Sequence, residues 1–378
     1  MKKIGYEKHD AFPSTFVKKN MKGAVISVIG LFVDDMIVST MYEDEMQKMS
    51  DFLSEHYKLK EIQADENGMQ RFLGMNLKVT RHKYGRTKSI NINQSEYIQS
   101  ILIEYGVPRR PRIKTPLPPG FYFDASLPES QLKSSDSALK IAKHEYRKKI
   151  GLLLYLSVMT RPDITYAVNY LAQFCEYPHP MLFTIIERLF EYLGNTANLS
   201  LHYKNRKSEP MEIFTDSDYA QEPTTRHSMN GYLVRLNGNI VHWKSKYTAL
   251  MCTSSTEAEL QAIFIASNEG IWFRQLCVFI GLLRKEDVCK YRVDNRSIVD
   301  AINNDNFSAT SKHYAVRLAT VKERLMKPDS DDPFSEKQIR FALNHISGED
   351  QLADILTKPI TVKVIEKLIP LIMDIPKE

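Results

Sequence analysis

A short apolar stretch that ends in acidic residues constrains the fold of this chain more than any other feature. Residues 211–215 have the composition of a strand, and Asp216 and Asp218 follow directly. Three more acids stand at the ends or on the inner faces of later predicted elements: Glu259, Asp294 and Asp354. Four carboxylates in one cleft repel one another unless cations neutralise them, so their convergence would imply bound metal. Hard oxygen ligands select Mg²⁺ or Mn²⁺.

Three consecutive antiparallel strands are predicted around the first of these acids. Residues 231–236 and 239–243 are joined by Asn237 and Gly238, which both tolerate the positive φ of a type I′ turn. Asn-Gly is the strongest short signal for a hairpin. With residues 211–215, the two runs predict three adjacent strands.

A helix and two further strands are predicted to carry the remaining acids. Ser254 and Glu257 have the spacing of a capping box, which begins a helix. Glu259 falls on the side of that helix that packs on the sheet, where a carboxylate is unfavourable unless it meets a cation. A fourth strand ends at Asp294, and a fifth precedes a short helix at Asp354. The order predicts a mixed five-stranded sheet with flanking helices.

A second pair of acids lies near the beginning of the chain. Residues 25–33 and 36–38 are β-rich runs, and Asp34 and Asp35 between them predict a hairpin with paired acids at its tip. Aspartate is common in exposed turns, which is one explanation of the pair. The other is a metal site for phosphoryl transfer, which would need a third acid from another strand.

Length and composition set wide bounds. The 378 residues predict about two or three domains, and the net charge of +5 is weak evidence for a polyanionic partner. The four cysteines lack the spacing of a zinc site, so we expect reduced thiols. The N-terminus does not have the pattern of a signal peptide, and the apolar run at residues 24–33 is too short to span a bilayer. We therefore expect a cytosolic or nuclear chain with no membrane partner.

The middle of the chain is predicted to be a linker followed by helices. Prolines cluster between residues 108 and 119, which is typical of an extended linker. Three helical runs follow, at residues 145–159, 164–174 and 181–193, and prolines separate them. This part carries no recognisable chemistry.

The acidic hairpin resembles a known motif. Residues 31–38, Leu-Phe-Val-Asp-Asp-Met-Ile-Val, are similar to the Tyr/Phe-Val-Asp-Asp motif of reverse transcriptases in the form used by copia-type LTR retrotransposons, and Phe-Leu-Gly at residues 72–74 matches a further element of that family. The family's polymerase takes another catalytic aspartate from an upstream strand, and nothing before Asp34 fits that strand. The resemblance therefore implies a truncated palm and thumb over residues 1–112, with Asp34 and Asp35 as metal ligands of a defective polymerase.

The C-terminal part resembles ribonuclease H of the same family. Glu-Leu-Gln-Ala-Ile at residues 259–263 is similar to the helix that carries the catalytic glutamate, and residues 345–359 match the C-terminal signature of copia-type elements. The resemblance implies that His345 assists product release, although a histidine there could also cap a strand. It implies that four acids hold two Mg²⁺ or Mn²⁺ ions: Asp216, Glu259, Asp294 and Asp354. We expect Asp218, Asp300 and Glu257 to be surface or capping acids.

A basic helix is predicted over residues 311–327. Its cations form either a solvated face or a track for phosphates beside the cleft, where each contact would add salt-dependent affinity. The candidates for nucleic-acid binding are Lys312, Arg317, Lys322 and Arg324.

Taken together, the resemblance implies the C-terminal part of a copia-type retrotransposon polyprotein, of multidomain α/β and α+β class. We expect a truncated reverse transcriptase palm and thumb at residues 1–112, a linker and helical connection at 113–210, a ribonuclease H-like domain at 211–359 and a C-terminal tail at 360–378. The expected activity is metal-dependent hydrolysis of the RNA strand of RNA/DNA hybrids. The expected partners are the hybrid and the remainder of a polyprotein, in cytoplasmic virus-like particles or in the nucleus. Two alternatives stay open: an inactive transposon remnant that only binds nucleic acid, and an integrase-like DNA-processing enzyme of the same fold.

Overall fold

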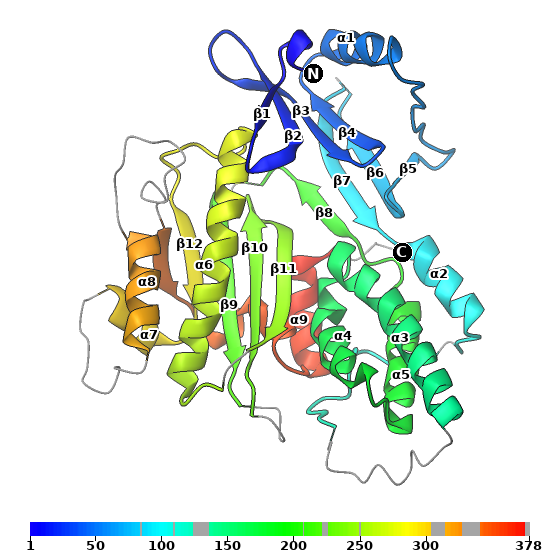
Figure 1. Ribbon diagram of the computed structural model, residues 1–378, viewed down its shortest axis with the longest axis vertical. Helices are drawn as coiled ribbons and strands as arrows, with labels where there is room; N and C mark the ends of the chain where they lie inside the picture. Colours follow the sequence, from blue (N-terminus) through cyan, green and yellow to red (C-terminus); the bar gives the residue numbers. More distant parts are fainter. Residues whose placement is uncertain are drawn as a thin grey trace.

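A computed structural model describes residues 1–83, 85–108, 110–123, 136–206, 208–220, 226–248, 251–303, 314–326 and 341–374. Three sheets organise these residues, and Figure 1 shows the two smaller sheets above the largest one. None of the described helices is long and apolar enough to cross a membrane.

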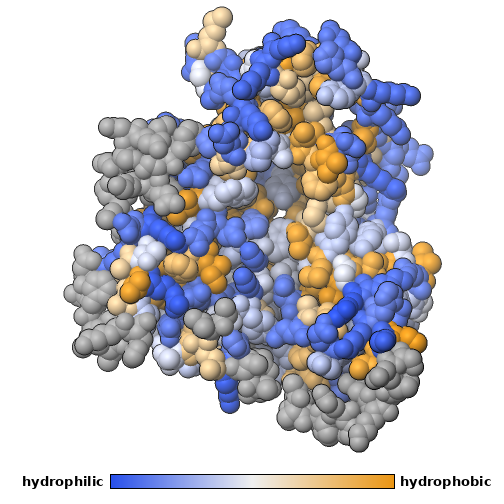
Figure 2. Space-filling model, in the orientation of Figure 1, coloured by the Kyte–Doolittle hydropathy of each residue, from blue (hydrophilic) through white to orange (hydrophobic). Residues whose placement is uncertain are grey.

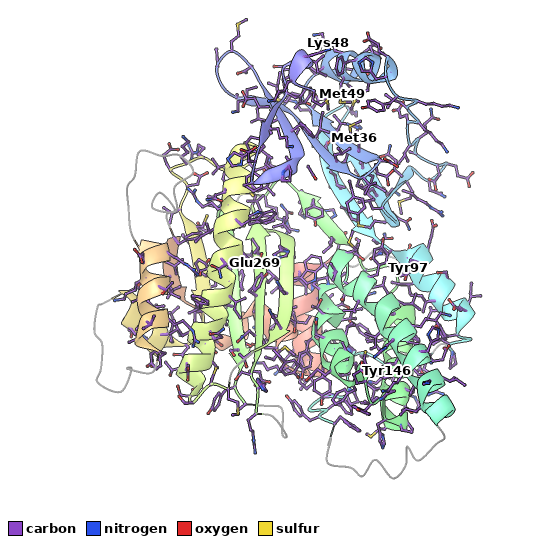
Figure 3. The ribbon with its side chains drawn as sticks, viewed as in Figure 1. Met36, Lys48, Met49, Tyr97, Tyr146 and Glu269 are labelled. Atoms are coloured by element: carbon purple, nitrogen blue, oxygen red, sulfur yellow. The ribbon has the colours of Figure 1, made fainter. Side chains whose placement is uncertain are left out.

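The first sheet contains the acidic hairpin. Its four antiparallel strands are β1 (Glu7–His9), β2 (Phe12–Lys19), β3 (Val25–Phe32) and β4 (Asp35–Thr40). Helix α1 (Glu43–Ser54) covers one face, and Figure 3 shows Met49 of this helix near Met36 of β4 in a small apolar core. Phe32 pairs with Asp35, which confirms the predicted hairpin and leaves Val33 and Asp34 at its tip. Figure 2 shows hydrophobic side chains over the upper sheets. In the β3–β4 hairpin, the hydrophobic side chains of Phe32 and Val33 are exposed.

The second sheet joins two parts of the chain that are far apart in sequence. Its strands are β5 (Met69–Phe72), β6 (Met75–Arg81), β7 (Thr87–Asn93) and β8 (Leu201–Lys204), and helix α2 (Ser95–Glu104) follows β7. Ile92 of β7 pairs with Leu201 of β8. The segment expected to be a linker and helical connection therefore also supplies a strand to the sheet of the first segment.

The predicted connection helices are present and enclose a core. They are α3 (Asp136–Met159), α4 (Thr165–Ala172) and α5 (Pro180–Asn195), with short 3₁₀ turns at Pro162–Ile164 and Gln173–Cys175. Between α3 and α4, the buried Arg161 pairs with the Asp163 carboxylate at 2.6 Å, and the Tyr192 hydroxyl donates to that carboxylate at 2.8 Å. The indole of Trp243 donates to the Ser157 carbonyl oxygen at 2.7 Å, which joins α3 to the largest sheet.

The largest sheet has the five strands expected from the sequence. They are β9 (Met211–Asp218), β10 (Met229–Leu236), β11 (Asn239–Tyr247), β12 (Cys289–Val293) and β13 (Phe341–His345), in the order β11-β10-β9-β12-β13. The first three are antiparallel, whereas β12 is parallel to both β9 and β13. Asn237 and Gly238 have φ values of 46° and 73°, as the predicted type I′ turn requires.

The two faces of this sheet are covered by different parts of the chain. Helices α6 (Ser255–Phe279), α7 (Arg296–Asn303) and α8 (Ala315–Met326) share one core with residues such as Ile213 and Tyr291. The opposite face, which includes Phe214 and Leu233, packs in one core with the connection helices and the C-terminal elements. Those elements are the short 3₁₀ turn η8 (Leu352–Leu356) and helix α9 (Val362–Ile372), and the exposed 3₁₀ turn η7 (Gly348–Asp350) precedes them.

The segment expected to be a tail is therefore largely structured. Residues 362–372 form α9, whose buried side chains include Ile365 and Leu368. Asp374 forms a backbone bridge with Ser200, beside strand β8. Residues 375–378 lie outside the described part of the chain.

Candidate metal centre

Three acids meet at one edge of the largest sheet. Asp216 lies near the end of β9 and Asp294 directly follows β12, and because these strands are parallel, both acids reach the same edge. Helix α6 packs on β9 and β10, and Glu259 in its second turn faces the same place. One carboxylate oxygen from each of Asp216, Glu259 and Asp294 lies within 4.8 Å of the others. Among the described residues, no other cluster of three potential ligands meets this criterion.

Burial and mutual repulsion make this cluster electrostatically unfavourable. Asp216 is 4% and Glu259 8% exposed. Burial, followed by the charges of Asp216 and Asp294, raises the pKa of Glu259 well above its usual value. Burial and the charge of Asp216 likewise raise the pKa of Asp294. A cation among these oxygens would favour the ionised carboxylates.

The donor set fits a divalent metal. All three side chains offer carboxylate oxygens, which Mg²⁺ and Mn²⁺ prefer. The Oε2 atom of Glu259 is buried without a hydrogen-bond partner. An orphaned buried oxygen is unfavourable, and a bound cation would satisfy it.

The fourth predicted acid, Asp354, lies beside this group of three rather than within it. It sits on η8, which is anchored to β9 because the Gln351 side-chain amide donates to the Thr215 carbonyl oxygen at 2.9 Å. Burial, followed by the charge of Asp216, raises the pKa of Asp354 to about 7. The Thr357 hydroxyl, which follows η8, donates to the Asp216 carboxylate.

Lys358, which is not among the predicted site residues, contacts two of the acids. Nζ of Lys358 lies 2.9 Å from Oδ1 of Asp354 and 3.8 Å from Oδ2 of Asp216. The lysine lies four residues after Asp354, and in the short helix predicted there this spacing is the signal of an ion pair. Burial raises the pKa values of Glu259 and Asp294, and the positive charge of Lys358 offsets part of that rise.

Asp218 was expected to be a surface or capping acid, but it is half-buried next to the cluster. Burial is the main reason why its pKa is raised to about 7, and the charge of Asp216 adds to the shift. The Tyr122 hydroxyl donates to its carboxylate at 3.4 Å. Tyr122 comes from the proline-rich linker, so no local pattern around Asp218 could have indicated this environment.

His345 lies at the rim of the centre. It ends β13, pairs with Val293 of β12, and is exposed. Its Nε2 atom is 3.1 Å from the backbone carbonyl oxygen of Asp294. The imidazole is thus close to one predicted ligand.

Glu259 and Glu257 have different environments, as the helical pattern indicated. The Ser254 hydroxyl accepts from the Glu257 backbone N–H at 3.1 Å, which confirms half of the capping box. The Glu257 carboxylate accepts from the backbone N–H of Thr253 at 2.7 Å and pairs with Arg317 at 3.5 Å. Glu257 therefore caps α6 and lies outside the group of three, to which Glu259 belongs.

The predicted basic track is directed partly towards the protein itself. Arg317 lies on α8, which packs on α6, and its guanidinium pairs with Glu257 of α6. The Arg324 guanidinium lies 4.8 Å from the ring centre of Phe264 and donates to the Ser267 hydroxyl at 3.3 Å. Lys312 falls outside the described residues, and Lys322 is half-buried on α8. Their binding to nucleic acid stays a prediction.

Asp34, at the tip of the β3–β4 hairpin, and Asp35, the first residue of β4, are both exposed. Within the described residues, neither belongs to a group of three potential metal ligands. Their role as metal ligands stays a prediction.

Fold and centre together define a mixed α/β protein with a buried acidic cluster at the edge of a five-stranded sheet. No family model matches the chain. It is 27% identical to the retrovirus-related Pol polyprotein from transposon TNT 1-94 of Nicotiana tabacum, over 95% of the chain and 25% of that protein. It is 28% identical to the corresponding polyprotein from transposon RE1 of Arabidopsis thaliana, over 95% of the chain and 22% of that protein. It is also 28% identical to the transposon Ty1-MR1 Gag-Pol polyprotein of Saccharomyces cerevisiae, over 90% of the chain and 19% of that protein.

The chain is thus a relative of copia-type retrotransposon polyproteins and corresponds to part of such a polyprotein, which confirms the resemblance found in its motifs. It spans about a quarter or less of the length of these relatives. Among solved structures, LC11-RNase H1 in complex with RNA/DNA hybrid is 20% identical, with 41% of this chain and 99% of that chain covered and a TM-score of 0.29. RNase H1 from Halobacterium salinarum is 12% identical, with 39% and 93% covered and a TM-score of 0.27.

Proposed function

We propose that this chain hydrolyses the RNA strand of RNA/DNA hybrids with divalent metal held by its acidic cluster. The observation that carries the proposal is the convergence of Asp216, Glu259 and Asp294 from two strands and a helix. Their order along the chain, and the relationship to retrotransposon polyproteins, support ribonuclease H chemistry rather than another metal-dependent reaction.

Each acid has a separate part in the proposed mechanism. Asp216 belongs to the group of three, is oriented by the Thr357 hydroxyl, and lies beside Asp354, the fourth proposed ligand. Glu259 has a buried oxygen free to bind an ion, and Asp294 extends the ligand set from β12. When bound, two Mg²⁺ or Mn²⁺ ions supply activation of the attacking water and stabilisation of the departing 3′ oxygen.

His345 would act at a later stage. Because its ring is exposed and lies near the backbone carbonyl oxygen of Asp294, it is placed to meet the cleaved strand rather than to hold metal. We assign it to product release. The proposed partners are the hybrid and other parts of a polyprotein, and location in virus-like particles or the nucleus stays a prediction.

The proposal is tested by substrate choice. Purified 378-residue chain is incubated with end-labelled RNA/DNA hybrid, double-stranded RNA and double-stranded DNA, each with Mg²⁺, Mn²⁺ or chelator. We expect cleavage only of the RNA strand of the hybrid, and only with metal. Cleavage of double-stranded DNA would instead support an integrase-like enzyme. Binding of the hybrid without any cleavage would support the inactive alternative.

We also expect no primer extension by this chain. Phosphoryl transfer with two ions needs acids from more than one strand, whereas Asp34 and Asp35 share one exposed hairpin tip. The measurement is incorporation of labelled nucleotide on a primed RNA template with either metal, and a competent reverse transcriptase serves as the positive control. Template-dependent incorporation above background would show that another acid completes the site.

A further inference from the structure

The acidic cluster already contains a cation of its own. Lys358 contacts Asp354 at 2.9 Å and Asp216 at 3.8 Å, and the side chains of these acids are 18% and 5% exposed. Among the described residues, no other lysine or arginine forms an ion pair with the four acids proposed as metal ligands. Within the described part of the chain, Lys358 is therefore the cation that pairs directly with the proposed ligands.

We propose that Lys358 is an internal counterion of the metal centre, which holds Asp216 and Asp354 together in the metal-free protein and is displaced when a divalent cation binds. This inference rests on the proposed function, because it assumes that Asp216 and Asp354 are metal ligands. Lys358 is a positioning residue in this account and takes no part in bond cleavage.

The first argument is repulsion between the acids. Asp354 and Asp216 both lie within 4 Å of the Lys358 Nζ atom, and their side chains are mostly withdrawn from solvent. Buried like charges disfavour the folded arrangement unless an opposite charge lies among them. The Lys358 ammonium lies within contact distance of both carboxylates and supplies that charge.

The second argument is competition for the same carboxylate group. Asp216 is a member of the group of three potential ligands, and its Oδ2 atom also accepts from Thr357 and faces Lys358. Two cations cannot both be held closely by one carboxylate without repelling each other. Repulsion by a metal bound to Asp216 and Asp354 therefore favours withdrawal of the ammonium.

The third argument is that Lys358 is able to move. Its side chain is 37% exposed, so a route to solvent is open. A lysine carries a compact charge on a flexible four-carbon stem, so it can leave without rearranging the backbone. Thr357 and Gln351 would continue to hold η8 against β9.

The test compares Lys358→Met, which keeps the length and removes the charge, with Lys358→Arg, which keeps the charge. Lys367→Met is the matched control, because Lys367 pairs with the exposed Glu349 at 3.6 Å and, among the described residues, forms no ion pair with the four acids proposed as metal ligands. Thermal unfolding midpoints are measured in chelator and at several Mn²⁺ concentrations, and the Mn²⁺ dissociation constant is measured by calorimetry. Circular dichroism verifies the fold of each variant.

In chelator we expect Lys358→Met to unfold at a lower temperature than wild type and Lys358→Arg to stay near wild type. We expect Lys358→Met to bind Mn²⁺ at least about fivefold more tightly, which is the lower end of typical coupling between two ligands. Its unfolding midpoint should therefore rise more with Mn²⁺ than that of wild type. The Lys367→Met control should match wild type in both measurements.

Unchanged Mn²⁺ affinity together with an unchanged midpoint in chelator would overturn the proposal. Weaker Mn²⁺ binding by Lys358→Met would also overturn it, because the lysine would then support the metal instead of competing with it. If wild type binds no Mn²⁺, the proposed metal function fails separately, and the midpoint in chelator still decides whether Lys358 stabilises the acids.

Discussion

Replacing Asp294 with asparagine is expected to reduce cleavage of the RNA strand of a hybrid by about 10³-fold. The substitution keeps the size and one oxygen atom but removes the charge that would hold metal between β12 and the other acids. Metal ions stabilise transition-state charge by several kcal/mol, and each 1.36 kcal/mol corresponds to about a tenfold change in rate. The measurement is the single-turnover rate on labelled hybrid at saturating Mg²⁺.

The fold of the Asp294→Asn variant should survive. The charge of Asp294 contributes to the raised pKa of Glu259, so its removal relieves repulsion inside the cluster. Asp300→Asn is the matched control, because Asp300 is an exposed acid on α7 that is 3.9 Å from Arg296. We expect this control to cleave like wild type. Equal cleavage by Asp294→Asn and wild type would refute the metal mechanism.

Replacing Gly231 with alanine is expected to destabilise the fold by about 1–3 kcal/mol and to lower cleavage as well. Gly231 on β10 pairs with Asp216, and a Cβ atom there would lie 2.8 Å from Cβ of Leu356 and 3.2 Å from the backbone oxygen of Ala353. It would also lie 2.7 Å from Cγ2 of Thr357. Because backbone is among these neighbours, η8 must shift, and the segment that orients Asp216 shifts with it. Chemical denaturation measures the change in the free energy of unfolding.

Gly151→Ala is the control for this substitution. Gly151 lies within α3, and no atom lies within 4 Å of the position of the added Cβ. Alanine in a helix interior is favoured over glycine, so we expect a gain of about 0.5–1 kcal/mol. A loss of stability at Gly151, or none at Gly231, would contradict the packing described around η8.

The local elements of this chain could be predicted from its sequence because their signals come from residues a few positions apart. The type I′ turn depends on Asn237 and Gly238 alone. The start of α6 depends on Ser254, whose hydroxyl accepts from the backbone N–H of Glu257 three residues later. The helical face identified Glu259 rather than Glu257 as the acid that turns towards the sheet. The proposed chemical role of the acids came from a resemblance to a family. The relatives confirm that resemblance, whereas the role of each acid stays a prediction.

What only the tertiary structure decided depends on contacts between residues far apart in sequence. Strand β8 pairs with β7, with Leu201 opposite Ile92. No pattern within residues 113–210 specifies β7 as the partner strand. The residues expected to form a tail become α9 because they complete an apolar core with the connection helices. Asp218 has a raised pKa because the fold buries it beside Tyr122 and Asp216. Local patterns determine which element each residue joins. The burial of a side chain and the charges around it depend on which elements pack together. For that reason only the fold revealed Lys358 among the acids.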